Sequence, residues 1–220
     1  MEQAEQRVSK LREWLRWAAG GRGLLLPVSG GTDSALCFWL CRQTLGEKVT
    51  AIYFGESLRA GEWFARVGPV EMCRLPAEEE KPEVARWARL LSLSLSRRVW
   101  LAGSRNRTED VLGTYSLASR VATIYPLVGL WKTEVLHLCE MAGVPEEIIA
   151  SSHEPDVPCG RTGLMAEIGL ARIDEFLQVR QGEVSEAQLQ DWPPKHRQYL
   201  EDIYQRGQSK RELPLRAPDL

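Results

Sequence analysis

A short polar segment near the N-terminus has the residue types that hold a phosphate group. It consists of Ser29, Gly30, Gly31, Thr32, Asp33 and Ser34, between the apolar run 24–28 and the apolar helical pattern 35–41. A glycine-rich turn between a strand and a helix directs backbone N–H groups and the positive end of the helix dipole at an oxyanion. Asp33 would repel a phosphate unless a divalent cation lay between them, and Mg²⁺ prefers one or two carboxylates plus phosphate oxygens. The segment therefore predicts a Mg-nucleotide site, although strand-to-helix turns also favour Gly, Ser and Asp as ordinary caps.

The elements that must position this segment alternate along the chain. Helical spacing predicts helices over 2–19, 34–45, 83–96 and 132–142. Short apolar runs predict strands over 24–28, 48–54, 70–75 and 98–102, and the tail over 185–206 has a helical pattern. This alternation predicts a Rossmann-like α/β fold, a doubly wound parallel sheet with flanking helices. Ligands bind beyond the carboxyl ends of strands in such sheets, where the turns after residues 28 and 102 both fall.

Composition limits the class of protein. The chain has 220 residues, 44% hydrophobic and 26% charged, with a formal net charge of −2. That balance fits one globular domain with a sizeable core, and the charge makes nucleic acid an unexpected partner. We see no run of about eighteen apolar residues and no N-terminal signal pattern, so we expect a cytoplasmic protein without a membrane segment. Five cysteines without a Cys-x-x-Cys motif fit reduced thiols.

The polar segment also resembles a known family motif. It lacks the Gly-Lys-Ser/Thr sequence of a Walker loop, and its Ser-Gly-Gly-x-Asp-Ser pattern resembles the pyrophosphate loop (PP-loop) of the ATP pyrophosphatases. Those enzymes split ATP between its α and β phosphates and adenylate a substrate oxygen. The resemblance implies the adenine nucleotide α-hydrolase-like form of the Rossmann-like fold, and it leaves the acceptor open.

Motifs later in the chain are similar to those of ammonia-dependent NAD synthases. They lie at 103–109, 113–115, 126–127, 130–135, 143–145, 160–162, 167–169 and 209–214. The first of them reads Gly-Ser-Arg-Asn-Arg-Thr-Glu, close to the family's Gly-Thr-x-Asn-x-x-Glu. Because the motifs span most of the chain, we predict a single NAD synthase-like ATP pyrophosphatase domain over residues 1–220.

This resemblance implies roles for particular residues. The ATP-binding residues would be Ser29, Gly30, Gly31, Asp33, Ser34, Gly103, Asn106 and Thr108. Asp33 and Glu109 would be Mg²⁺ ligands, and Asp33 and Lys132, near the phosphates, would be the catalytic residues. Without the resemblance, Glu109 could simply be an acid in the first turn of a helix and Lys132 a solvated surface lysine.

The implied activity is that of a Mg-ATP-dependent ligase. It would adenylate a substrate carboxylate, release pyrophosphate and amidate the carboxylate with ammonia, most simply converting deamido-NAD to NAD. Members of the family are homodimers, so we expect a homodimer here. We see no glutaminase domain in the sequence and expect free ammonia or a separate glutaminase to supply the nitrogen.

Departures from the family pattern lie on the acceptor side. Residues 116–125 contain no acid where the family has a Gly-Asp pair and a further Asp, Ser209 replaces a histidine, and Gly163 and Leu164 replace an acidic pair. These changes suggest a smaller or more anionic acceptor. By their charge, the residues that could grip such an acceptor are Arg120, Arg161 and Lys210.

Two alternatives remain open from the sequence. Cys159 ends a Pro-x-x-x-Cys segment beside Arg161, the spacing used by PP-loop sulfur transferases related to NAD synthases. A thiol beside an arginine can have the lowered pKa that sulfur transfer needs, although an incidental loop cysteine would look the same. The second alternative is a nucleotide-binding relative that has lost turnover.

Overall fold

The strands form one parallel sheet. The computed structural model describes residues 2–75, 80–156 and 161–211. Within them the sheet has four strands in the order β3-β2-β1-β4, all parallel to their neighbours. The strands are β1 (Leu24–Pro27), β2 (Val49–Phe54), β3 (Val70–Cys73) and β4 (Trp100–Leu101). The structure thus confirms the predicted Rossmann-like α/β fold.

Helices cover both faces of the sheet, because alternate residues of β1 point to opposite sides. Leu24 and Leu26 pack in one apolar cluster with α1 (Glu2–Ala19), α2 (Thr32–Leu45), α3 (Gly61–Val67) and α6 (Lys132–Met141). Leu25 faces the other way, into a cluster with α4 (Pro82–Arg97) and the short helix η2 (Leu117–Val121). The apolar run of β1 is therefore buried on both sides, as expected for a central parallel strand.

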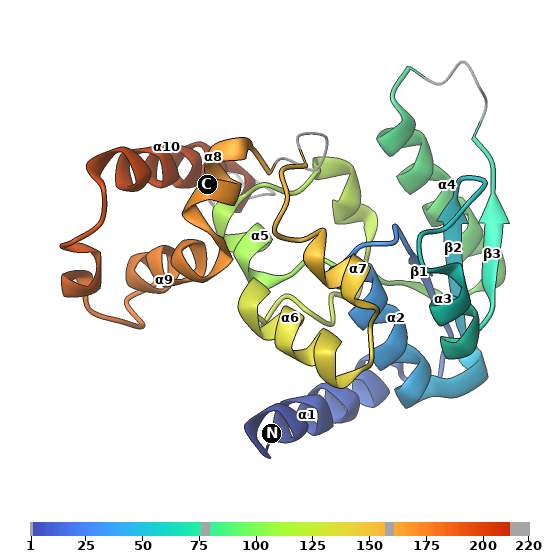
Figure 1. Cartoon of the computed structure of the whole chain (residues 1–220). Helices are drawn as coiled ribbons and strands as arrows, with labels where there is room; N and C mark the ends of the chain where they lie inside the picture. The colour runs from blue at the N-terminus through green and yellow to red at the C-terminus, as the bar shows by residue number, and fades with distance from the viewer. Residues whose placement is uncertain (1, 76–79, 157–160, 212–220) are drawn as a thin grey trace, which may run out of the picture.

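The strand order changes direction beside β1. The chain passes from β1 through β2 to the edge strand β3, three strands that Figure 1 labels. It then returns to place β4 on the other side of β1. The loops that follow β1 and β4 consequently leave neighbouring strands at the same edge of the sheet. Such a switch point is where ligands bind in open α/β sheets. The loop after β4 leads into α5 (Arg107–Leu112).

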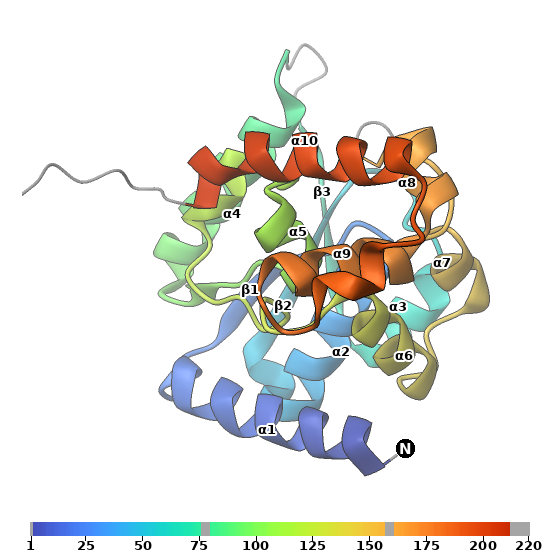
Figure 2. The same ribbon diagram turned by 90° about the vertical axis from the view of Figure 1, so that its left-hand side faces the viewer.

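A second apolar cluster lies among the helices that follow α6. It joins α5 to the C-terminal helices and includes the buried Phe176 and Leu177. The remaining elements are η1 (Gly46–Lys48), α7 (Glu146–Ala150), α8 (Gly163–Ile168), α9 (Leu170–Arg180), η4 (Glu186–Leu189) and α10 (Pro194–Arg211). Figure 2 shows α10 and α1 at opposite ends of the molecule. Among the described helices, none is long and apolar enough to cross a membrane.

The long elements match the sequence predictions better than the short ones. α1 has the predicted bounds, and the predicted helices at 34–45, 83–96 and 132–142 differ from α2, α4 and α6 by one or two residues at an end. β4 is shorter than predicted because Arg98 has a positive φ of 55° and caps α4. The sequence analysis did not predict α3, α5, α7, α8 or α9. Four of these helices, α3, α5, α7 and α8, have seven residues or fewer, too few turns for a clear apolar period, and α9 has eleven.

α5 and α10 cross at two glycines. A Cβ at Gly207 would lie 2.2 Å from the carbonyl oxygen of Leu112 and 3.1 Å from the Cα of Gly113. We expect Gly207→Ala to lower the free energy of unfolding by about 2 kcal/mol, because the backbones would have to separate. Urea unfolding measures this change. The control is Gly61→Ala in α3, where a Cβ would meet nothing within 4 Å, and an equal loss in both variants would contradict the prediction.

Candidate active site

The turn after β1 has the geometry of an anion-binding loop. Gly30 has a positive φ of 81°, which glycine adopts without strain. The Ser34 hydroxyl accepts from the backbone N–H of Ser29 at 3.0 Å and donates to the carbonyl of Gly31 at 3.0 Å. Gly31 is the N-cap of α2, and no side chain caps it among the described residues. The hydroxyls therefore fix the turn from within, and the N-terminus of α2 is left to bind an anion.

The loop after β4 reaches this turn through one amide. Asn106 caps α5: its side-chain oxygen accepts from the backbone N–H of Glu109 at 2.9 Å, and Glu109 accepts from the backbone N–H of Asn106 at 3.4 Å. The Asn106 side-chain N–H₂ group is directed the other way and donates to Asp33 at 2.7 Å. The reciprocal cap at α5 thus positions Glu109, in the first turn of that same helix, beside Asp33 in the first turn of α2.

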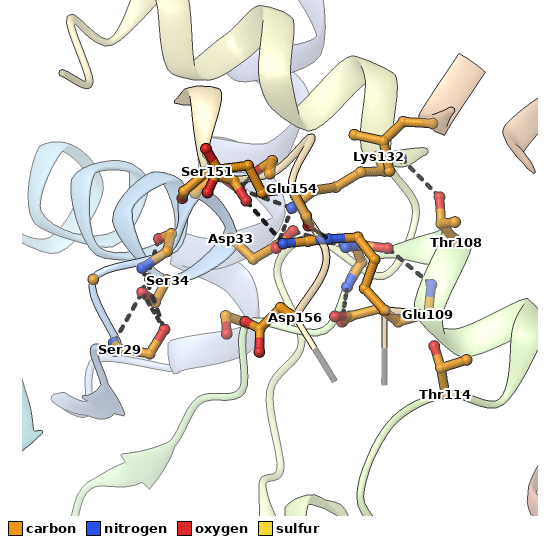
Figure 3. Close-up of a pocket in the computed structure, with 18 of the residues that line it drawn as sticks. Ser29, Asp33, Ser34, Thr108, Glu109, Thr114, Lys132, Ser151, Glu154 and Asp156 are labelled. Carbon is orange, nitrogen blue, oxygen red and sulfur yellow. Dashed lines mark hydrogen bonds and ion pairs between the residues drawn. The ribbon is translucent and has the colours of Figure 1, made fainter. Parts of the chain in front are cut away.

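Lys132 joins the two loops from a third direction. It begins α6, it is only 6% exposed, and its ammonium group donates to Asp33 and, at 2.8 Å, to the hydroxyl of Thr32. Figure 3 shows Asp33 between the turn of Ser29 and Ser34 on one side and Lys132 and Glu109 on the other. The side chain of Lys132 is therefore directed into the cavity and is not a solvated surface lysine.

A buried carboxylate fixes the start of α6. Asp174, on α9, accepts from the backbone N–H and the hydroxyl of Thr133, both at 2.8 Å, and from the hydroxyl of Thr108. The same Thr108 oxygen accepts from the backbone N–H of Lys132 at 2.8 Å. Burial raises the pKa of Asp174, and the threonine hydrogen bonds oppose that rise. The sequence alone assigned no role to Asp174, whereas the structure makes it the anchor for the helix that carries Lys132.

The carboxylates of the site oppose each other. Burial, and after it the negative charge of Asp33, raise the pKa of Glu109 to about 7, against the opposing effect of Lys132. Both Asp33 and Glu109 line a cavity of about 700 Å³ at the switch point of the sheet. The arrangement thus places two acids and a lysine around one space at the carboxyl edge of the sheet, a grouping typical of polyphosphate sites that hold a divalent cation.

The far wall of the cavity follows α7. Ser151, Glu154 and Asp156 line it, as Figure 3 shows. Arg161 lines it too, and its guanidinium donates to the carbonyl of Ser151 at 2.8 Å and to the carbonyl of Glu154. Its backbone pairs with that of Asp156 as a short antiparallel bridge. The guanidinium group of Arg161 therefore stabilises this wall through its hydrogen bonds to the two carbonyls. Cys159 lies outside the described residues.

The structure brings most of the predicted site residues together, but not all of them. Those that line the cavity are Ser29, Gly30, Gly31, Asp33, Ser34, Asn106, Thr108, Glu109, Lys132 and Arg161. Gly103 is not among its described lining residues. A Cβ there would lie 2.6 Å from the ring of Tyr125, so this position packs closely against that ring.

Arg120 and Lys210 are also outside the described lining. Arg120 donates to the backbone carbonyl of Lys210 at 2.9 Å, and the ammonium group of Lys210 donates to the carbonyl of Tyr115 at 2.7 Å. Together they attach α10 to the segment after α5. Their acceptor-binding role stays a prediction, and the contacts described for them in this chain are structural.

Comparison with known proteins agrees with this geometry. The sequence model of the NAD synthase family matches residues 75–214, more than half of the chain. The chain belongs to the NAD synthase family. As a member of that family it is an ATP-dependent ligase.

Individual members of the NAD synthase family match over most of the chain. The NH(3)-dependent NAD(+) synthetase of Pyrococcus horikoshii is 27% identical, over 94% of this chain and 92% of the relative. That of Trichlorobacter lovleyi is 29% identical, over 73% of this chain and 69% of the relative. The likeness thus reaches both sides of the cavity.

Solved structures share the fold. The NH3-dependent NAD synthetase of Campylobacter jejuni has a TM-score of 0.78 at 19% identity, over 98% of this chain and 99% of that one. An NMN synthetase from Francisella tularensis has a TM-score of 0.77 at 19% identity, over 99% of each chain. The NAD synthase fold is therefore preserved at low identity.

Proposed function

We propose that this protein is a Mg-ATP-dependent amide ligase that converts deamido-NAD to NAD with ammonia. The observation that carries the proposal is the meeting of Asp33, Glu109 and Lys132 around one cavity, each from a different element. In support, relatives that match most of the chain are named NH(3)-dependent NAD(+) synthetases. Because the chain belongs to this family, we expect ATP and a carboxylate substrate as the reactants.

The residues fit a magnesium ion. Asp33 and Glu109 repel each other, and this repulsion contributes to the raised pKa of Glu109. The described residues contain no group of three or more His, Cys, Asp or Glu that could hold a metal by themselves. Mg²⁺ needs only one or two carboxylates when phosphate oxygens complete its coordination. When bound between the two carboxylates, the ion would offset charge on the leaving pyrophosphate.

The proposed reaction has two steps. A carboxylate oxygen of the acceptor attacks the α phosphorus of ATP, the bond to the bridging oxygen of the β phosphate breaks, and pyrophosphate leaves. Ammonia then attacks the acyl carbon, AMP leaves with the bonding electron pair, and a proton passes to solvent. No side-chain nucleophile is needed. The turn at Ser29–Ser34 and Lys132 would hold the polyphosphate chain and stabilise the charge that develops on it.

Product analysis tests the proposal. With Mg-ATP, ammonium chloride and nicotinic acid adenine dinucleotide, we expect AMP, pyrophosphate and NAD in equal amounts. Nicotinic acid mononucleotide is the matched alternative acceptor, because the acceptor-side departures and the fold shared with an NMN synthetase leave a smaller nucleotide open. ATP binding without AMP formation for either acceptor would contradict the ligase assignment.

One substitution separates nitrogen transfer from sulfur transfer. Cys159→Ser should leave the rate of amide formation unchanged, because the proposed steps use no thiol. A sulfur transferase would instead lose product formation in this variant. Comparison of this variant with the wild type therefore decides between the two group transfers.

A further inference from the structure

The loop after β2 lies directly against the anion-binding turn. Because β2 pairs with β1, the chain segments that follow these two strands leave neighbouring positions at the same sheet edge. A Cβ built on Gly30 would be 3.3 Å from the Cβ of Arg59 and 3.5 Å from a methyl carbon of Leu58. Tyr53, Ser57 and Arg59 all line the cavity. No motif in the sequence indicated this segment.

This loop is anchored at both ends. At its start, the Tyr53 hydroxyl donates to the carbonyl of Ser57 at 2.8 Å. At its end, Ala60 has a left-handed φ of 50°, and its carbonyl accepts from the backbone N–H of Trp63 at 2.9 Å. Trp63 and Phe64 are buried in the main apolar cluster. The position of Arg59 is thus fixed by core packing and by a backbone conformation that non-glycine residues rarely adopt.

Arg59 differs from the other cations of the cavity in its partners. Lys132 is paired with Asp33, and Arg161 donates to two backbone carbonyls. Arg59 is exposed, and it has no hydrogen bond or ion pair within the part of the chain that the structure describes. An unengaged guanidinium beside an anion-binding turn has its full set of donors available to a phosphate.

We propose that Arg59 binds the polyphosphate chain of ATP beside Gly30 of the anion-binding turn. The assignment rests on ATP being the nucleotide of the proposed function. ATP brings several negative charges to a cavity that Asp33 and Glu109 already make acidic. Arg59 supplies a cation that is paired with neither acid. The planar guanidinium group can donate to two phosphate oxygens at once.

Ligand binding without an acceptor tests the role of Arg59. Calorimetric titration should show that Arg59→Ala weakens binding of Mg-ATP and of Mg-pyrophosphate by about 10- to 100-fold, the range of charge-assisted hydrogen bonds. Binding of AMP, which lacks the β and γ phosphates, should change less than about threefold on the same grounds. Arg59→Lys should restore part of the loss, because it keeps the charge without the planar fork.

The control is Arg66→Ala, an exposed arginine of α3 outside the described lining, which should bind all three ligands like the wild type. Unchanged Mg-ATP affinity in Arg59→Ala would overturn the inference, as would equal losses for ATP and AMP. A loss confined to the KM of the acceptor would overturn it too, since the guanidinium would then serve the acceptor. A wild-type protein that fails to bind Mg-ATP would instead overturn the proposed function itself.

Discussion

Asp33→Asn is expected to lower the rate of pyrophosphate release by about 10²- to 10³-fold, the size of effect seen when one preorganised electrostatic group is lost. The substitution keeps the shape of the side chain and removes its charge. Asn106 and Lys132 donate to different carboxylate oxygens of Asp33, so the variant keeps an acceptor for only one of these two donors. It also loses a proposed metal ligand. Quench-flow measurement of AMP and pyrophosphate checks the rate, and Asp191→Asn on the surface is the matched control.

Stability should change much less than activity in this variant. The charge of Asp33 is one cause of the raised pKa of Glu109. Without the charge of Asp33, Glu109 ionises more readily, and its carboxylate then compensates the positive charge of the buried Lys132 ammonium group. We therefore expect a large penalty, about 3–5 kcal/mol, only in the double variant Asp33→Asn/Glu109→Gln, which leaves Lys132 buried without a charge partner. Additive losses in urea unfolding of the single and double variants would contradict this compensation.

Glu109→Gln is expected to stabilise the ligand-free fold at alkaline pH while it reduces turnover. Burial, and after it the charge of Asp33, raise the pKa of Glu109 in the folded protein to about 7, from its ordinary value of 4.5. Between those pH values the folded state holds a proton that the unfolded state has released, so raising the pH lowers the free energy of unfolding. At pH 8 this loss amounts to about 3 kcal/mol, and at pH 4 it is nearly absent.

Urea unfolding across pH checks this effect. In the wild type, stability should fall between pH 5 and pH 8 by an amount that Glu109→Gln largely removes, because glutamine does not titrate. Glu109→Asp, which keeps an ionisable group, is the control and should retain a pH-dependent loss. A variant whose pH profile overlays that of the wild type would contradict the assignment. Mg-ATP should raise the melting temperature of the wild type more than that of Glu109→Gln.

Local sequence signals were sufficient for the elements on the N-terminal side of the site. The buried run at 24–28, the glycine turn and the apolar helix pattern predicted the loop that carries Asp33, and β1 and α2 follow it closely. These signals are short-range: glycine tolerates the positive φ of residue 30, and a run buried on both faces is typical of a central parallel strand. The fold class followed from the alternation of such elements.

Local sequence patterns did not predict that the charged residues of the site would lie together. Glu109 and Lys132 were placed beside Asp33 in advance only through the resemblance to NAD synthases. In the structure that grouping depends on β4 returning to the side of β1 and on Asn106 reaching across to Asp33. These contacts join residues far apart in the chain, which periodicity does not detect.

The arginines show most clearly what the sequence could not predict. Residue type gives their charge, but only the tertiary structure gives their hydrogen-bond and ion-pair partners. Arg120 donates to a carbonyl 90 residues away, and Arg161 holds the cavity wall. Arg59, which no motif indicated, lies beside Gly30 because β2 pairs with β1. The sequence by itself determined the anion-binding turn, the parallel sheet and the family. Tertiary structure alone decided which charged groups face the cavity. Long-range packing pairs some of these groups with carbonyls or acids of the chain and leaves the donors of others available to a ligand.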